Sequence, residues 1–201
     1  MYPDILTKAI NCFKKFDGIG EKSAERLSLS LLEMSREDVD NIINTFNELK
    51  ETVLRCKICG HITDNEVCSI CSNKFRNNNL ICVVEDYKSV FMFEKTGNYE
   101  GKYHVLNGLI SPIDGITPDE LNINTLIDRV TKLNKENISI ELIIALKPSI
   151  EGEATTLYLK KILESYNVKI TRLSYGIPMG VEIDYLDSIT LERALKDRKD
   201  I

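Results

Sequence analysis

The spacing of apolar residues separates a helical first part of the chain from a longer part in which strands and helices alternate. Near the amino terminus, apolar residues recur every three to four positions, as on one face of an α-helix. This pattern predicts a helix around Ile10, a second from about Lys22 to Met34, and a third after Ser35, which with Asp38 forms a weak capping-box pattern. The residues expected to face inward in the second helix are Ala24, Leu27, Leu31 and Leu32.

From about residue 79 onward, short apolar runs alternate with segments of helical period. Strands are predicted at 80–84, 102–106, 140–146 and 168–173, with a strand-like run at 181–186. Helices are predicted at 87–95, 121–134, 151–166 and 190–196. Continuous apolar strands that alternate with helices indicate a parallel sheet covered on both faces. The fold class expected is therefore a multi-module α/β protein with a helical region at its amino-terminal end.

Four of the six cysteines form a C-x2-C, eight-residue, C-x2-C pattern that predicts a metal site. Each pair, Cys56 with Cys59 and Cys68 with Cys71, brings two thiolates to one side of a short loop. Two such loops can face each other and bind Zn²⁺ as a tetrahedron. The filled shell predicts one structural zinc ion per chain, with His61 left exposed. The competing interpretations are redox-active C-x2-C pairs and buried cysteines without a ligand.

A second motif, Gly18-Ile19-Gly20, lies between the first two predicted helices. Its glycines allow a tight turn, and the helix that follows begins with free N–H groups that suit a phosphate. Lys22 and Arg26 lie four residues apart on one helical face, so both can reach phosphates without reading bases. This is the layout of a helix-hairpin-helix. The alternative is an ordinary glycine turn with solvated charges, which the neighbouring Asp17 and Glu21 favour.

Acidic residues follow two of the predicted strands. Glu85 follows the strand at 80–84, and Glu151 and Glu153 follow the strand at 140–146. Because parallel strands end at a common edge, we expect these carboxylates to lie near one another. They could hold Mg²⁺. Alternatively, Glu151 and Glu153 simply open a helix, where acidic residues are favoured.

Bulk properties narrow the classes of protein further. The 201 residues carry a net charge of −5 and a sequence pI of about 5.2, so any DNA affinity has to come from one local basic face. We find neither a run of about 18 apolar residues nor a signal-peptide pattern, so we expect a cytoplasmic protein without membrane contact. A GxxxxGK[ST] loop is also absent from the sequence, which argues against ATP hydrolysis.

Taken in order along the chain, these motifs resemble the RecR family of bacterial recombination mediators. The resemblance covers essentially the whole sequence. The segments that carry it are DGIGEKSAERL (17–27), CSICSN (68–73), ICVVE (81–85), LISPIDGITPDEL (109–121), PSIEGEAT (148–155), YGIPMG (175–180) and TLERAL (190–195).

The resemblance implies a division into modules. It implies a helix-hairpin-helix region for DNA binding and dimerisation at 1–54 and a four-cysteine zinc finger at 55–72. A Toprim domain would occupy 79–175, and a tail at 176–201 would make oligomer contacts.

The resemblance also implies a function and partners. The family's DNA contacts fall on Lys22 and Arg26 beside Gly18 and Gly20, and its zinc ligands fall on the four cysteines. Its Toprim acids fall on Glu85, Glu151 and Glu153, which would serve chiefly in partner contact, with Mg²⁺ as the less favoured occupant. The implied protein is not an enzyme. It forms dimers or ring-like tetramers and binds single-stranded, double-stranded and gapped DNA at the nucleoid. With the partners RecO and RecF it helps RecA to load onto DNA coated by single-strand binding protein.

The chain departs from the family pattern at three positions. Asp17 replaces the usual proline, Lys147 replaces an asparagine, and Val181 replaces a glycine. Two other functional classes stay open. One is a magnesium-dependent Toprim nuclease or topoisomerase-like enzyme, and the other is a zinc adaptor without DNA contact.

Overall fold

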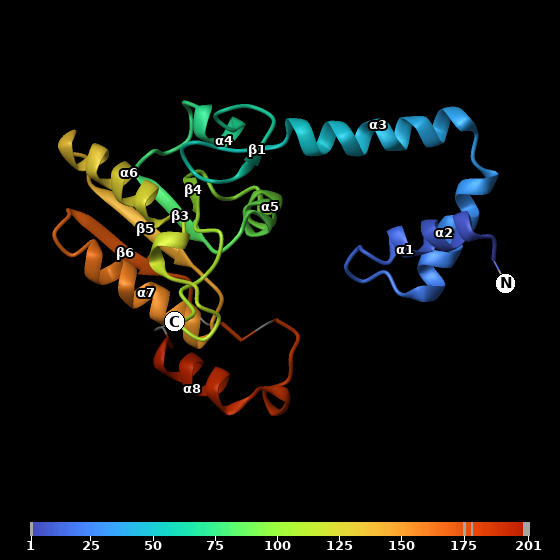
Figure 1. Ribbon diagram of the computed structural model, residues 1–201. Coiled ribbons are helices and arrows are strands. Elements are labelled where there is room, and N and C mark those ends of the chain that lie inside the picture. Colours follow the sequence, from blue (N-terminus) through green and yellow to red (C-terminus); the bar gives the residue numbers. More distant parts are fainter. Residues whose placement is uncertain (1, 175, 178, 199–201) are drawn as a thin grey trace. The chain divides into compact units, whose positions relative to one another are not determined.

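The computed structural model describes residues 2–174, 176–177 and 179–198 and divides the chain into two compact units (Figure 1). The first unit covers 1–53 and the second covers 54–201. Each has its own buried cluster of apolar side chains. The YGIPMG motif includes Tyr175 and Pro178, which lie outside the described residues.

The first unit is helical, as the periodicity predicts. Its helices are α1 (Asp4–Phe13), α2 (Glu21–Glu33) and α3 (Arg36–Thr52). Leu6 and Ile10 of α1 pack against Ala24 of α2, and these three side chains form a small buried cluster. Ser35 caps α3 as predicted, because its hydroxyl oxygen accepts a hydrogen bond from the Asp38 backbone N–H at 3.1 Å.

The predicted inward positions of α2 are only partly correct. Ala24 is fully buried, whereas Leu27 and Leu32 are 36% and 69% exposed. The physical reason lies in α3, none of whose residues is buried, so this helix does not supply a third wall around α2. The unit therefore leaves much of its apolar surface open to solvent.

The second unit is built on a parallel sheet with strand order β4-β3-β5-β6. The strands are β3 (Leu80–Val84), β4 (Lys102–Val105), β5 (Ile140–Ala145) and β6 (Val168–Arg172). The helices that accompany them are α5 (Tyr87–Thr96), α6 (Ile123–Lys135) and α7 (Ile150–Ile162). These elements confirm the α/β interpretation of the sequence.

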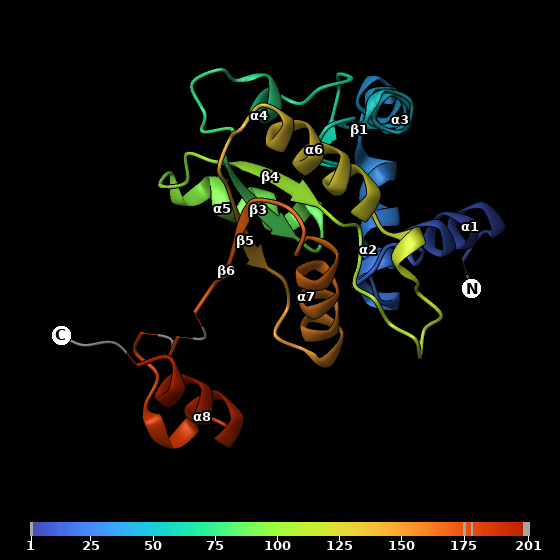
Figure 2. The ribbon, with the colours of Figure 1, turned by 90° about the vertical axis from the view of Figure 1, so that its left-hand side faces the viewer.

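Alternate residues of the strands face different helices (Figure 1 and Figure 2). Ile81 and Val83 of β3 belong to the large cluster with α6 and α7. Cys82 and Val84 belong to a smaller cluster with Val90 of α5. This period of two explains why the whole strand is apolar, since both of its faces are buried.

Smaller elements complete the second unit. They are β1 (Leu54–Arg55), β2 (Ile62–Thr63), α4 (Ser69–Ser72), the 3₁₀ turns η1 (Pro118–Glu120) and η2 (Ile183–Tyr185), and α8 (Ser188–Lys196). The prediction of a strand at 181–186 is wrong, because this segment contains η2 and pairs with no described strand. Its apolar residues Val181 and Ile183 are exposed, so alternation alone did not bring a partner strand. Within the described part of the chain, no helix is both long and apolar enough to span a membrane.

The buried hydroxyl of Thr155 ties α7 to the loop after β4. It accepts a hydrogen bond from the Ile110 backbone N–H at 2.9 Å and donates one to the Glu151 carbonyl oxygen at 2.7 Å. The contact joins residues 45 positions apart, so it fixes tertiary structure and not only the helix.

Thr155→Val should destabilise the protein by roughly 1–2 kcal/mol, because the Ile110 N–H loses its acceptor in a partly buried site. Thr156→Val is the matched control, since among the described residues the Thr156 hydroxyl bonds only to the Gly152 carbonyl oxygen of its own helix. Urea unfolding measures both variants. Equal losses of unfolding free energy in the two would contradict the role assigned to Thr155.

Candidate metal centre and nucleic-acid interface

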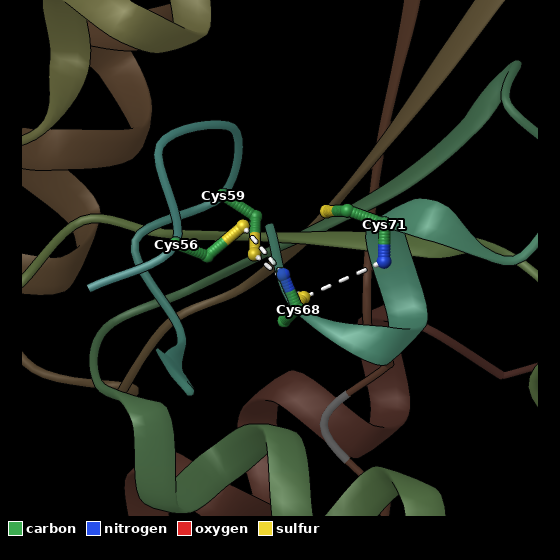
Figure 3. A group of neighbouring side chains, drawn as sticks. All are labelled: Cys56, Cys59, Cys68 and Cys71. Carbon is green, nitrogen blue, oxygen red and sulfur yellow. Dashed lines mark hydrogen bonds between the residues drawn. The ribbon is translucent and has the colours of Figure 1, made fainter. Parts of the chain in front are cut away.

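Two short segments bring the four predicted cysteines together. Cys56 and Cys59 lie between β1 and β2, while Cys68 and Cys71 lie at the start and within α4. All four are buried, and their sulfur atoms lie within 4.8 Å of one another (Figure 3). Among the described residues this is the only group of three or more Cys, His, Asp or Glu side chains placed to hold a metal ion.

The geometry of the cluster fits a tetrahedral zinc ion. A Zn–S bond of about 2.3 Å places two sulfur atoms of a tetrahedron about 3.8 Å apart. The Sγ atoms of Cys59 and Cys68 are 3.7 Å apart. Two backbone N–H groups point at sulfur atoms, Cys68 at Cys56 Sγ (3.3 Å) and Cys71 at Cys68 Sγ (3.4 Å), which suits thiolates. Four thiolates fill the shell, so the site is built for structure and not for activating water.

The electrostatics of the four sulfur atoms call for a cation. The pKa of Cys56 lies far below its ordinary value because the thiols of Cys59, Cys68 and Cys71 hydrogen-bond to it. The pKa of Cys59 is raised, mainly because its thiol is the partner in the bond with Cys56. Thiols in such close contact share protons unequally, and a bound dication removes the conflict by stabilising all four as thiolates.

The segment that carries the four cysteines, residues 54–72, is called the cysteine module here. It is attached to the edge of the sheet at β4. The Val105 backbone N–H donates to the Cys59 carbonyl oxygen at 2.7 Å, and the Asn122 side chain donates to the Val105 carbonyl oxygen at 3.0 Å. Gly60 makes this approach feasible. Its φ is +74°, and a Cβ atom there would lie 2.7 Å from Asn122 Nδ2 and 3.0 Å from the Val105 oxygen.

The prediction that His61 is exposed is wrong. Its side chain is only 6% exposed and lies edge-on against the Phe91 ring, with 4.9 Å between ring centroids. Burial lowers the pKa of His61, so the ring is neutral at physiological pH. The side chain serves as an apolar contact between the cysteine module and α5.

The glycine turn between α1 and α2 places the predicted DNA contacts on the surface. Gly18 has a φ of +79°, which requires glycine, whereas Gly20 is extended and precedes α2 without capping it through a side chain. Lys22 and Arg26 are both exposed on α2. Glu21, which counted against this site, forms an ion pair with Lys14 of the preceding segment.

The acidic residues at the other candidate site have different surroundings. Glu85 directly follows β3, and its backbone oxygen accepts from the Gly108 N–H at 3.1 Å. Glu151 and Glu153 stand in the first turn of α7, as the helix-opening alternative requires. Ser149 caps that helix, and a hydrogen bond with the Ser149 side chain lowers the pKa of Glu151. Glu153 pairs with Arg172 at 3.3 Å and with Arg193 of α8 at 3.5 Å.

Sequence reasoning missed the role of Gly152 in this loop. A Cβ atom at this position would lie 1.9 Å from the Lys147 carbonyl oxygen, so only glycine lets α7 start against the chain that leaves β5. The only sequence signal was a glycine between two acidic residues in a helical pattern. This close approach explains the glycine of the Glu-Gly-Glu sequence.

Four family models match consecutive parts of the chain. They are the RecR helix-hairpin-helix (residues 6–49), the RecR four-cysteine zinc finger domain (53–73), the Toprim domain (79–174) and the RecR C-terminal model (176–199). The zinc-finger match includes all four clustered cysteines. The helix-hairpin-helix match includes Gly18, Gly20, Lys22 and Arg26.

Curated relatives match over almost their full length. The Recombination protein RecR of Natranaerobius thermophilus is 41% identical over 200 residues, which cover 100% of this chain and 98% of the relative. The proteins of the same name from Staphylococcus haemolyticus and Staphylococcus aureus are each 42% identical over 200 residues, with 100% of this chain and 99% of the relative covered.

The fold and the cysteine site define a modular Toprim protein with a helix-hairpin-helix and a four-cysteine zinc finger. More narrowly, the chain belongs to the RecR family.

Cys59→Ser should abolish stoichiometric zinc and lower the unfolding free energy, because metal-binding free energy contributes to folding when the ligands come together only in the native state. Cys12→Ser is the control, since Cys12 is exposed on α1 and far in sequence from the cluster. Elemental analysis of protein purified without chelators should give one zinc per chain for the control. Zinc-free wild-type protein, or Cys59→Ser that retains full zinc, would contradict the assignment.

Proposed function

We propose that this chain is a recombination mediator without catalytic activity of its own. It binds DNA without sequence preference and, with RecO and RecF, promotes the loading of RecA onto gapped or protein-coated single strands. The observation that carries the proposal is the series of four family matches in order along residues 6–199, since relatives matched over this length are recombination proteins by name. We propose a cytoplasmic, nucleoid-associated location on the same basis.

We assign a separate role to each module of the chain. Residues 1–54 bind DNA and dimerise, residues 55–72 hold one structural zinc ion, residues 79–175 form the Toprim domain, and residues 176–201 contribute oligomer contacts. The dimerisation role is supported by the apolar stripe of α3. Ile43, Phe46 and Leu49 lie three residues apart, and each is more than half exposed. A second copy that covers this stripe would remove it from water, as expected in a dimer or a ring of dimers.

The proposed DNA surface is the start of α2. Its first N–H groups are not capped by a side chain at Gly20, and the helix dipole places partial positive charge there. Lys22 and Arg26 add two cations on the same side of the helix. The pairing of Glu21 with Lys14 neutralises an acid that would otherwise repel phosphate. These features support backbone contacts, which carry no sequence preference.

The proposed partner surface is the acidic start of α7. Glu151 is placed in the first turn without an ion pair among the described residues, so its charge is available to a basic partner. Glu153 is already paired with two cations, Arg172 and Arg193. Opposite charges at such a surface steer encounter and fix register, which suits contact with RecO.

The alternative is a magnesium-dependent Toprim enzyme. The acidic edge is the set of carboxylates Glu85, Glu151 and Glu153. A metal ion bound there would have to compete with Arg172 and Arg193 for Glu153, which weakens this hypothesis. Incubation with nicked, gapped and supercoiled DNA in the presence of Mg²⁺ distinguishes the mediator from the enzyme. The mediator hypothesis expects binding with no cleaved or relaxed product.

Lys22→Glu combined with Arg26→Glu should weaken binding to every DNA tested and reduce the slope of log affinity against log salt by about one unit for each lost phosphate contact. Lys88→Glu with Lys95→Glu on α5 makes the same change in net charge within the second unit and should have much less effect. Fluorescence anisotropy across a salt series measures both. An unchanged slope in the α2 variant would place the DNA surface elsewhere.

Glu151→Ala combined with Glu153→Ala should weaken RecO binding roughly tenfold, since two charges that steer and position the partner are lost. Zinc content and intrinsic DNA binding should stay close to wild type. Glu136→Ala with Glu164→Ala removes the same charge from exposed positions outside the edge. Pull-down with purified RecO and DNA titration are made on the same samples. Normal RecO binding together with lost DNA binding would instead support a metal-bridged DNA site.

A further inference from the structure

Lys102 is a buried lysine whose counter-charge is not obvious. It is the first residue of β4, its side chain is only 5% exposed, and its Nζ donates to the Cys71 carbonyl oxygen at 2.5 Å. Within the part of the chain that the structure describes, no carboxylate forms an ion pair with it. Lysine is almost never fully buried without a charged partner, because removing an ammonium group from water is costly.

Arg129 of α6 is a second cation on the same side of the cysteine cluster. Its half-buried guanidinium donates to the Tyr103 carbonyl oxygen at 2.8 Å and also has no carboxylate ion pair among the described residues. Burial lowers the pKa of Arg129, and the negative charge of Cys71 and Cys59 opposes that decrease. Arg129 also lines the same cavity as Cys71, one of the four clustered cysteines.

The two cations and a cysteine meet at one cavity. A cavity of about 470 Å³ is lined by Cys71, Lys102 and Arg129, with the side chains of Lys132, Asp128 and Glu136 also in its lining. Neither of these two acids forms an ion pair with either cation, so neither supplies the counter-charge within the described structure. The remaining anion is the metal site. Four thiolates around Zn²⁺ leave an excess of two negative charges, which is the charge that two nearby cations can balance.

We propose that Lys102 and Arg129 are the counter-charges of the zinc tetrathiolate and thereby couple zinc occupancy to β4 and α6 of the Toprim domain. Lys102 also holds the backbone of α4 through the Cys71 carbonyl, so one side chain both balances the charge and orients a ligand segment. Outer-shell groups of this kind tune metal affinity even though they do not touch the metal. The inference rests on zinc occupying the four cysteines, which the elemental analysis of wild-type protein tests independently.

The test compares zinc affinity in full-length variants. Lys102→Met keeps the length of the side chain and removes its charge, and Arg129→Gln removes the second charge. Arg129→Lys retains that charge. Lys132→Met is the matched control, because Lys132 lines the same cavity but forms no bond to the cysteine module within the described structure. Competition with a chromogenic chelator gives the zinc dissociation constant, and the absorption spectrum of the cobalt-substituted protein reports whether four thiolates still bind as a tetrahedron.

Both charge-removing variants should bind zinc about 10–100-fold more weakly than wild type while the cobalt spectrum keeps its tetrahedral form. Arg129→Lys should retain most of the affinity, and Lys132→Met should match wild type. The stabilisation of the fold by zinc, measured as the difference in melting temperature with and without chelator, should shrink in Lys102→Met and Arg129→Gln. Unchanged zinc affinity in both variants would overturn the proposal. The proposal would also be overturned if each variant lowered the melting temperature equally with and without zinc. Lys102 and Arg129 would then stabilise the fold by packing, independently of the metal.

Discussion

The hydrogen bond between the Val105 backbone N–H and the Cys59 carbonyl oxygen attaches the cysteine module to β4, and the covering of this sheet edge depends on that attachment. β4 lies at one end of the sheet, where unpaired backbone groups would otherwise face solvent. The cysteine module covers part of this edge, and Gly60 allows the close approach. A metal ion that fixes the module thus also protects an edge of the sheet. This arrangement explains how so short a segment is held without a core of its own.

The sequence predicted those elements whose signals are local. The apolar runs that predict β3 and β5 and the cap at Ser35 depend on neighbouring residues, and the structure confirms these elements. The failures concern packing between distant segments. Residues 181–186 alternate like a strand, but a strand also needs a free sheet edge in register, which spacing does not report. Leu27 and Leu32 look inward by period, yet the burial of a helical face depends on where the other helices lie.

The residues of the candidate sites also divide into those predicted from local spacing and those that depend on distant packing. The four cysteines were predictable because each pair is set by a tight turn and the pairs are only eight residues apart. The burial of His61 was not, because it depends on Phe91 of α5, thirty positions later in the chain. Lys102 and Arg129 gave no sequence signal at all, since a lysine at the start of a strand and an arginine in a helix are ordinarily solvated. Only the fold brings both to the cysteine cluster.

At the acidic edge, ion pairs bear on whether the carboxylates bind a metal ion or a basic protein surface. A Toprim sheet places acids where its strands end, and in this chain the loop after β5 reaches that edge with Gly152 pressed against the Lys147 carbonyl. Glu153 then accepts from guanidinium groups of β6 and α8. An arginine supplies positive charge in a fixed, directional form, whereas a metal ion would need several oxygen ligands to converge. With Glu153 held by two arginines, Glu151 in the first turn of α7 is a carboxylate of this loop that has no ion pair among the described residues. A carboxylate of this kind is consistent with the partner surface proposed above, because it attracts a basic protein surface and repels phosphate unless a metal ion bridges the two.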